Sequence, residues 1–583
     1  MAGQFPVPDK YKVTASFDKE KYFLGENVLL HFCVENTGAQ PFSVDAGGDY
    51  RGAARHLRFK VTAVDASGKA ARDPHPASYC MGGLSSSSSL KPGEKFYASL
   101  PLMRYCAIDA PGTYTVTVGH DLGWKLAGKK PPIASTTITF VAPSPAEAQA
   151  VVDRTAKLPA DGNSVFGKRT DDYEDFSTLA YPVYFPILMK RLKTTATTTA
   201  EDEANKHTLE GIGAIATSEA THALLDLAGG SNPKLALEAA GYLNLRLPDP
   251  QLTGKLGPRN VFEDPQKSER QWLVKHAWRP EFVPAVRKLA RAYLKSSDKQ
   301  HIVMGAFMLE CVGTADDITP LTAALDKAIE QTKGMKLEEG IYPRPRGAVA
   351  ELMRAAEVLS KQQHAPPTTN PKTPGEAVLF LTAIGADGKF RPSGWQSVYA
   401  RLLKHELPYV REVALNNLPS PTPAEFRKQV ADLLLDPEVD TQIAACHVAE
   451  KEVDSTFKGP LLKALQQGKE EWLLRTALNA AAKQAIYSQA LIILAERLDE
   501  PGMTQHSFDL LLGIFTGAQG WGSNKVPDAA DGARMKPLWL AFLKQHAKQI
   551  DGGQQIKIGD PALSKEMFPA TFQFNLSGGK KWP

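Results

Sequence analysis

Residues 407–418 read LPYVREVALNNL, and this short stretch decides how most of the chain is interpreted. Four of its apolar residues fall on one face of a helix: Val410, Val413, Ala414 and Leu418. The spacing therefore predicts one short amphipathic helix, which needs a partner helix to cover its apolar face.

A second helix is predicted to pack on the first. Residues 422–425 read TPAE, which has the form of a capping box with proline at the first helical position. Apolar residues then recur at i, i+4, i+7 and i+8, as Phe426, Val430, Leu433 and Leu434. Asp436-Pro437 ends this helix, so the two segments form one helical pair.

The helical pattern continues to residue 483. A further helix is predicted over residues 439–448, and the apolar spacing starts again after Gly459-Pro460. The small residues Ala414, Ala444 and Ala477 stand about 30 residues apart, a period expected of stacked helical hairpins. We therefore expect these alanines in the seams between neighbouring helices.

Residues 407–414 resemble the second-helix signature of a HEAT-type repeat, and residues 436–445 and 208–247 resemble looser copies. The resemblance implies a right-handed α-solenoid of HEAT-like helical hairpins, here over residues 206–536, with long loop insertions. It also implies that the concave face or the loops bind a partner. These motifs carry no catalytic residues that could be transferred to this chain.

The first 142 residues follow a different pattern, in which short runs rich in Val, Thr, Phe and Tyr are separated by turn residues. The runs lie at residues 11–17, 28–35, 56–64, 95–100, 113–118 and 133–141. They predict an antiparallel β-sandwich, and the serine run at residues 85–89 is expected to be a solvated loop. The fold class is thus a multidomain β + α protein.

Four short turn sequences in this region carry a second resemblance: YFLGE at 22–26, ENTG at 35–38, KPGE at 91–94 and APGTY at 110–114. They resemble immunoglobulin-like modules of bacterial secreted proteins and also the intracellular proteinase inhibitor family of bacilli. The first resemblance implies an adaptor domain, and the second implies a protease inhibitor.

Residues 143–205 are predicted to be a linker with one helix and a polar loop. Within it, residues 162–169 read GNSVFGKR, a near match to a phosphate-binding loop. Arg169 stands where a Ser or Thr must hold magnesium, so we interpret the stretch as an ordinary loop. Residues 211–216, GIGAIA, imitate a dinucleotide fingerprint but lie inside a helical pattern, which indicates close helix packing.

Residues 537–583 are predicted to close the helical stack. An amphipathic helix is expected over residues 537–550, and an extended tail rich in aromatic residues follows it. Such a tail can cover the apolar end that a solenoid would otherwise expose.

Composition excludes some partners. The 583 residues are 43% hydrophobic and 23% charged, with a net charge of +4, so nucleic acid is not expected as a partner. No apolar run approaches the ~18 residues of a membrane span. The first residues lack signal-peptide features, yet the β pattern favours a periplasmic or extracellular protein whose leader has been removed. The alternative is a cytoplasmic protein, and the oligomeric state is left open.

The five cysteines allow two interpretations. Cys80 and Cys106 lie in loop-rich segments, so they are the pair expected to form a disulfide in an oxidising compartment. The alternative is that they are reduced thiols. Cys311 and Cys446 fall on apolar helix faces and are expected in the core.

No catalytic residue, metal ligand or cofactor site is predicted, because the HExxH, GxSxG and CxxC patterns are missing from the sequence. Aromatic residues and arginines gather instead in three predicted loop insertions at residues 248–282, 384–399 and 516–536. Gly-rich loops with tryptophan often line a binding face. The predicted binding residues are Trp278, Arg391, Trp395 and Trp521, and the alternative is that the tryptophans fill gaps between irregular repeats.

These patterns predict a non-enzymatic binding or scaffold protein of a bacterial envelope or secreted system. Its solenoid would be the platform, its β-sandwich the adaptor, and its partner a protein or a polysaccharide. One alternative is a polymer-active hydrolase with a site built from the loop insertions. The other alternative is a protease inhibitor that acts through the β-sandwich.

Overall fold

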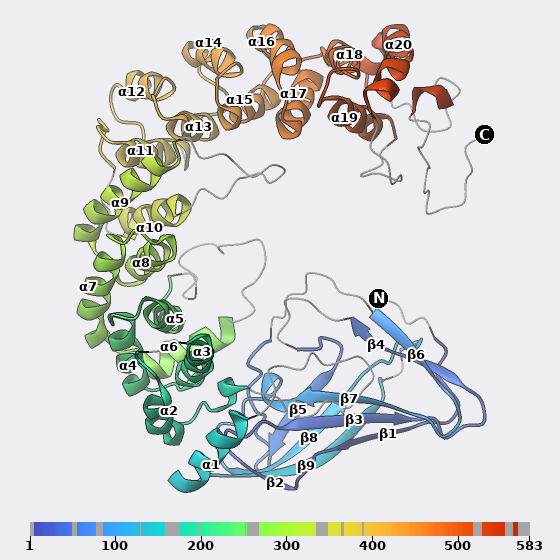
Figure 1. The fold of residues 1–583 in the computed structure, drawn as a ribbon, viewed down its shortest axis with the longest axis vertical. Coiled ribbons are helices and arrows are strands. Elements are labelled where there is room, and N and C mark those ends of the chain that lie inside the picture. The colour runs from blue at the N-terminus through green and yellow to red at the C-terminus, as the bar shows by residue number, and fades with distance from the viewer. Residues whose placement is uncertain are drawn as a thin grey trace. The chain divides into compact units, whose positions relative to one another are not determined.

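The computed structural model has β-sheets at the N-terminus and a long helical region after them (Figure 1). It describes residues 5–48, 55–76, 85–128, 130–157, 175–195, 198–250, 252, 267–333, 348–362, 367–386, 390–516, 528–553 and 564–568. The chain divides into two compact units, Met1–Asp317 and Ile318–Pro583. The predicted succession of a β region and a helical region is therefore confirmed.

The described strands are short, and all belong to the first unit. They are β1 (Lys12–Ser16), β2 (Lys21–Phe23), β3 (Leu29–Glu35), β4 (Phe42–Gly48), β5 (Lys60–Asp65), β6 (Ser85–Leu90), β7 (Lys95–Pro101), β8 (Gly112–Gly119) and β9 (Ile133–Val141). They form sheets in the orders β1-β3-β7, β2-β9-β8-β5 and β4-β6. Pairing is antiparallel within these sheets except between β2 and β9, which run parallel.

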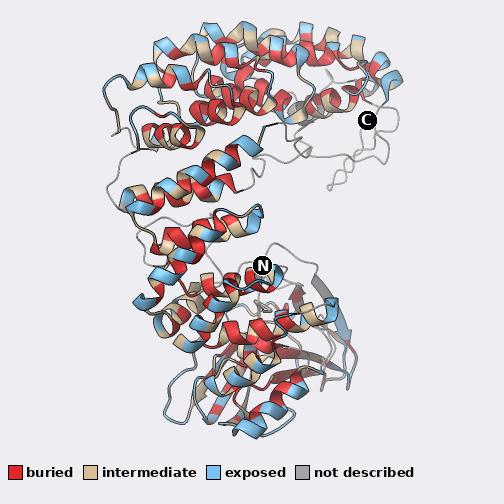
Figure 2. Ribbon diagram, turned by 60° about the vertical axis from the view of Figure 1, so that its left-hand side comes forward, coloured by how far each residue is buried: buried red, intermediate tan, exposed pale blue. Residues whose placement is uncertain are grey.

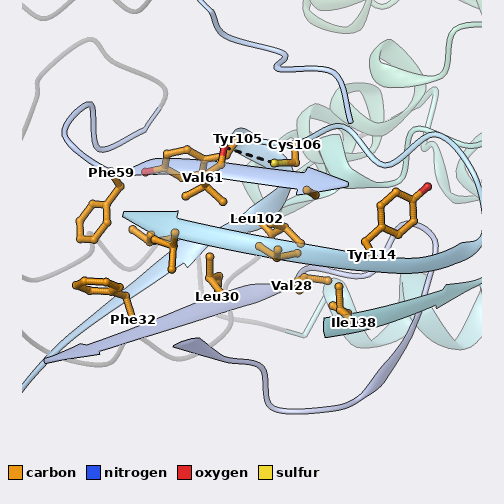
Figure 3. Close-up of a cluster of buried hydrophobic side chains, with 14 of the residues drawn as sticks. Val28, Leu30, Phe32, Phe59, Val61, Leu102, Tyr105, Cys106, Tyr114 and Ile138 are labelled. Atoms are coloured by element: carbon orange, nitrogen blue, oxygen red, sulfur yellow. Dashed lines mark hydrogen bonds between the residues drawn. The ribbon is translucent and has the colours of Figure 1, made fainter. Parts of the chain in front are cut away.

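The two larger sheets contribute side chains to one apolar core (Figure 3). Leu30 and Phe32 from β3 are fully buried, and Val61 from β5 and Ile138 from β9 belong to the same cluster. Burying one such side chain stabilises a fold by roughly 1.5–3 kcal/mol. The alternating apolar residues of these strands therefore meet in a common interior, as their period of two requires.

One local prediction in the β region is wrong. The serine run is part of β6, which pairs with β4 from Phe42 opposite Leu90 to Gly48 opposite Ser85. Serine has a weak preference for strands, so the sequence pattern gave no strand signal there. The pairing depends on tertiary anchors, because Leu90 is buried and the Trp124 indole N–H donates to the Ser43 carbonyl at 2.9 Å.

The helices of the first unit follow the β region. They are α1 (Pro145–Thr155), α2 (Phe185–Arg191), α3 (Thr199–Ala214), α4 (Ser218–Ala228), α5 (Pro233–Asn244), α6 (Lys267–Ala277), α7 (Val283–Tyr293) and α8 (Lys299–Val312). Two of them start with complete capping boxes, Ser144 with Glu147 and Thr198 with Glu201. Each box satisfies backbone N–H groups that a helix start leaves without a partner.

The second unit is helical throughout its described part. Its helices are α9 (Ile318–Gln331), α10 (Val349–Gln362), α11 (Pro374–Ala386), α12 (Trp395–Leu402), α13 (Pro408–Asn416), α14 (Ala424–Leu433), α15 (Val439–Lys451), α16 (Ser455–Gln467), α17 (Glu471–Lys483), α18 (Tyr487–Glu496), α19 (Thr504–Thr516), α20 (Ala529–Gln545) and α21 (Ala547–Asp551). Among the described helices of both units, none is long and apolar enough to cross a lipid bilayer.

Helices α13 to α18 form two rows (Figure 1). One row contains α14, α16 and α18, and the other contains α13, α15 and α17. Each helix buries the face that meets its neighbours and exposes the opposite face (Figure 2). Ala414, Ala444 and Ala477 are fully buried, one on each helix of the second row. This arrangement is compatible with a helical solenoid.

The predicted capping box at residues 422–425 is wrong. Helix α14 begins after Pro423, and no side chain caps its first turn. The Thr422 backbone N–H donates to the carboxylate of Glu452, which follows α15. A carboxylate from the next helical pair thus accepts the hydrogen bond that the predicted local cap would have accepted.

Two predicted helix starts are also wrong, because Pro460 and Pro537 lie inside helices. Asp454 caps α16 through the Thr456 N–H at 2.9 Å, and Asp528 caps α20 through two backbone N–H groups at 3.0 Å. Once a cap has started a helix, an internal proline removes one hydrogen bond without setting the boundary. The described tail residues 564–568 pack on α20, where the Trp539 indole N–H donates to the Met567 carbonyl at 2.8 Å.

We expect Ala477→Leu to destabilise the protein by about 1–3 kcal/mol, because the larger side chain overpacks the seam between α15 and α17. The matched control is Ala482→Leu, an exposed position on the same helix. Urea unfolding followed by circular dichroism measures both. Equal stability of the two variants would contradict the packing described here.

A second prediction concerns Asp317, which is fully buried and accepts hydrogen bonds from Arg287 Nε at 2.9 Å and Arg291 Nε at 2.6 Å. Burial alone would raise the pKa of this carboxyl, but the Thr314 N–H and the two guanidinium groups outweigh burial and lower it. A carboxyl with a lowered pKa in the folded state stabilises the fold at pH values above its unfolded-state pKa of about 3.9. This stabilisation is lost as the pH falls through the folded-state pKa.

Asp317→Asn should therefore cost about 1.5–3 kcal/mol at neutral pH, and the variant should lose less additional stability in acid than the parent. Urea unfolding at about pH 7 and about pH 3 tests this expectation. Asp316→Asn, at an exposed neighbouring position, is the control. A parallel loss of stability in acid for the parent and Asp317→Asn would refute the assignment.

Candidate functional site

A cleft of about 670 Å³ lies within the first unit, between the β region and the first helices. One wall comes from the β region, at residues 27–29, 72–75 and 101–109. The other wall comes from residues 175–182, the end of α3, the end of α5 and one face of α6. The volume falls in the range of about 300–1,000 Å³ that small-molecule sites have.

The first wall is attached to the second through the turn at residues 24–26. The Tyr184 hydroxyl donates to the Leu24 carbonyl at 2.5 Å, and the Thr178 hydroxyl donates to the Gly25 carbonyl at 3.0 Å. Gly25 has a φ of +97°, and a Cβ atom there would lie 2.4 Å from the Tyr184 ring. Only glycine fits this position, because both the backbone conformation and the close ring exclude a side chain.

Glu26 strengthens the same junction. Its carboxylate is 3% exposed and is paired with Arg154 of α1 and with Lys19 at 3.4 Å. A buried carboxylate is tolerated only when cations or hydrogen-bond donors compensate it. The first helix is thus held to the β region by charge as well as by packing.

Helix α6 closes the cleft on another side. Its residues Glu269, Trp272, Leu273 and His276 line the cleft at spacings of three and four, so they share one helical face. The Arg72 guanidinium lies 3.0 Å from the Glu269 carboxylate and 4.6 Å from the centre of the Trp272 ring. The α6 face is therefore bound to the β region by an ion pair and a cation–π contact.

The turn after α3 is fixed by Arg246, which is fully buried. Its guanidinium donates to the carbonyls of Ile212, Gly213 and Ile215 at 2.8–2.9 Å, and burial lowers the pKa of Arg246 to about 9. These carbonyls lie at a helix C-terminus, where a cation is favoured. The residues that follow them, Ala214, Ala216 and Thr217, line the cleft.

The predicted close packing at residues 211–216 agrees with the structure. A Cβ atom on Gly211 would lie 2.9 Å from Leu188, and one on Gly213 would lie 2.3 Å from the Tyr242 ring. Tyr242 lines the cleft, and burial raises its pKa well above the ordinary value. The small residues of α3 thus set the position of one aromatic ring in the cleft wall.

Acidic side chains dominate the charged part of the lining. Arg104 lies 3.6 Å from the Asp175 carboxylate, and Arg72 is paired with Glu269. Asp109 and Glu210 add two further carboxylates. Asp109 is an exposed residue of the lining, and partial burial of its carboxyl raises its pKa although Arg72 and Lys69 act in the opposite direction.

The structure brings two of the predicted binding residues together, outside this cleft. The Arg391 guanidinium lies 5.0 Å from the centre of the Trp395 ring and donates to the backbone carbonyls of Ile384 and Phe390. Trp395 also contacts the rings of Tyr399 and Phe426, and both predicted residues are half-buried. These contacts link the end of α11 to α12 and α14, and a binding role for Arg391 and Trp395 stays a prediction.

The other predicted residues do not join them. Trp278 lies in the first unit, where it contacts Phe282, and it does not line the cleft. Trp521, Cys80 and the phosphate-loop-like residues 162–169 lie outside the described residues. Cys106 is buried with its Sγ 3.8 Å from the Val61 carbonyl oxygen, and burial raises the pKa of its thiol to about 12 (Figure 3). The disulfide with Cys80 stays a prediction.

Sequence reasoning missed the residues that line the cleft. The segment 248–282 was predicted to be a loop insertion, but residues 267–277 form α6, because Glu269, Trp272, Leu273 and His276 follow helical spacing. That spacing was the available signal. Arg72 and Asp109 had no such signal, since only the fold brings them to α6. Among the described residues, no group of three or more His, Cys, Asp or Glu side chains is placed to hold a metal ion.

Comparison with known proteins adds little. No protein-family model matches the sequence, and no curated protein matches it. One solved structure that the chain is similar to is described as the crystal structure of an engineered protein. The identity is 15%, the match covers 65% of this chain and 97% of that chain, and the TM-score is 0.23. A TM-score this low carries no argument about fold or function.

We expect Gly25→Ala to destabilise the first unit more than Gly93→Ala does. Both glycines have a positive φ, which costs an alanine about 1 kcal/mol, but Gly93 has no atom within 4 Å of its Cβ position. Alanine at residue 25 must also displace the Tyr184 ring, which adds about 1–3 kcal/mol. Chemical unfolding of the full chain compares the two variants, and equal losses would show that the junction tolerates a side chain.

Proposed function

We propose that this protein is a non-enzymatic binding or scaffold protein. In this proposal the helical region is a right-handed α-solenoid of HEAT-like hairpins, and the β region is an immunoglobulin-like sandwich that serves as an adaptor. The two rows formed by α13 to α18 support the first assignment. The common core of the two larger sheets supports the second.

The cleft of the first unit carries the proposal. It combines a volume suited to a small ligand or a segment of a larger partner with a lining of apolar, aromatic and charged side chains. Its walls come from the β region and from four helical segments, which hydrogen bonds and ion pairs hold in place. A preformed cleft binds with a smaller ordering cost than a site that must assemble around its ligand.

Two thiols, Cys106 and Cys446, are buried outside the cleft. Burial raises the pKa of Cys106 to about 12 and raises the pKa of Cys446 further. A thiol with a raised pKa is a poor nucleophile. We further propose a protein or polysaccharide partner. We also propose a bacterial envelope or secreted location, which the resemblance of the β region implies.

A blocked cleft tests the proposal. Ala214 is half-buried in the lining, and Ala214→Trp would fill space there without changing a charge. Ala292→Trp, at an exposed position on α7, is the matched control. We expect small molecules that bind the parent in ligand-observed NMR to be lost from Ala214→Trp and kept by Ala292→Trp. Thermal melts confirm that both variants are folded.

Two results would count against the proposal. One is a set of ligands that bind Ala214→Trp as well as they bind the parent, because their site would then lie elsewhere. The other is a parent that binds none of the molecules in a broad set, because a preformed cleft of this size should bind some of them weakly.

A further inference from the structure

We propose that a surface shared by α19 and α20 is a docking site for a short peptide. It holds residues 564–568 of its own chain and accepts the same residues from a second copy. Residues 564–568 form the tail segment, and Phe508, Arg534 and Trp539 form the docking surface. The contacts between these two sets of residues carry the inference, which concerns the second unit and does not depend on the cleft.

The docking surface binds the backbone of the tail segment. The Arg534 guanidinium donates hydrogen bonds to the carbonyls of Glu566 at 2.6 Å and Phe568 at 2.7 Å. The Trp539 indole N–H donates to the Met567 carbonyl between them at 2.8 Å. Two side chains of α20 thus bind three consecutive carbonyls. The charged donor makes its hydrogen bonds stronger than neutral ones.

Two apolar side chains anchor the same segment. Met567 and Phe568 are both 3% exposed, and the Phe568 ring lies edge-to-face against Phe508 of α19 and Trp539 of α20. Each of the two ring centres lies 6.4 Å from the centre of the Phe568 ring. Helices α19 and α20 both pack against α18, and the tail segment connects them a second time. Buried anchors beside a bound backbone are features of a peptide-binding site.

The contact is small enough to be reversible. Burial of Met567 and Phe568 and the three hydrogen bonds favour docking, but docking also orders the backbone of the tail segment. These opposing terms are similar in size for so short a segment, so a docked and a released state are both accessible. Release exposes the rings of Phe508 and Trp539 to water, which favours occupation of the surface by another chain.

A second copy is the occupant that these contacts fit. Its tail segment is identical, so it makes the same hydrogen bonds and ring contacts as those observed within one chain. Exchange of identical segments replaces each contact with an equal one. Association then depends on the concentration of the second copy relative to the effective concentration of the attached segment. Binding between copies is therefore strongest when docking within one chain is prevented.

Two full-length variants separate the two halves of the contact. Arg534→Glu keeps the tail segment but replaces the donor of the docking surface with a carboxylate that repels its carbonyls. Phe568→Asp keeps the docking surface but places a charge where the apolar anchor lies. Fluorescently labelled Arg534→Glu is titrated with unlabelled Phe568→Asp up to about 0.5 mM, because a single short segment binds weakly. Microscale thermophoresis measures the dissociation constant.

We expect labelled Arg534→Glu to bind Phe568→Asp about threefold or more tightly than it binds the parent, whose docking surface is partly occupied by its own tail segment. The double variant Arg534→Glu, Phe568→Asp lacks the guanidinium donor and should show no binding. The peptide acetyl-Ser-Lys-Glu-Met-Phe-amide, which reproduces the tail segment, should compete with labelled Arg534→Glu for Phe568→Asp.

Glu566→Ala, introduced into labelled Arg534→Glu, is the matched control. The Glu566 side chain is exposed, and only its backbone carbonyl meets Arg534, so this change should leave the dissociation constant the same. Thermal melts show whether each variant is folded. If Phe568→Asp is unfolded, Phe568→Ala replaces it, because alanine removes the anchor without adding a charge.

Three results would overturn the inference. The first is a lack of binding between folded Arg534→Glu and the folded Phe568 variant. The second is equal binding to the Phe568 variant and to the double variant, or binding that the peptide does not displace, because the contact would then lie elsewhere. The third is equal binding to the parent and to the Phe568 variant, because the tail segment would then not occupy the docking surface of its own chain.

Discussion

The contact between Tyr184 and the turn at Gly25 is the constraint on which the first unit depends. The Tyr184 hydroxyl donates a hydrogen bond to the Leu24 carbonyl, and the Thr178 hydroxyl donates one to the Gly25 carbonyl. Both carbonyls belong to the turn at residues 24–26. Gly25 allows this approach because its φ is +97° and because it has no side chain to meet the ring. The position of residues 175–184 then fixes where the α3 end and the β region face each other across the cleft.

Buried guanidinium groups provide the next level of order, because they connect helix ends that lie far apart in the sequence. Arg246 donates to the last carbonyls of α3, and Arg497 donates to the carbonyls of Leu465 and Gly468 at the end of α16. Arg411 instead forms a bidentate pair with the buried Asp436, at 2.7 and 2.8 Å. Each group satisfies carbonyls or carboxylates that would be costly to bury alone. Replacement of such an arginine would leave several acceptors without a partner at once.

The sequence predicts those parts of this fold in which local pattern and tertiary packing agree. The helices between residues 402 and 483 have apolar faces at helical spacing, and their buried alanines lie where the period places them. The prediction fails where a residue far away in the sequence determines the local structure. Glu452 takes the Thr422 N–H that a local cap would have used, and the tertiary anchors at Trp124 and Leu90 hold the serine run of β6 in a strand.

The cleft is the extreme case of this dependence on distant groups. Arg72 and Glu269 are paired although about 200 residues separate them, and no spacing rule relates one to the other. The carboxyl of Asp109 also depends on the fold, because burial raises its pKa and the distant Arg72 lowers it. A local pattern can therefore predict the helical face of α6, but only the complete fold brings that face to Arg72 and so closes the cleft.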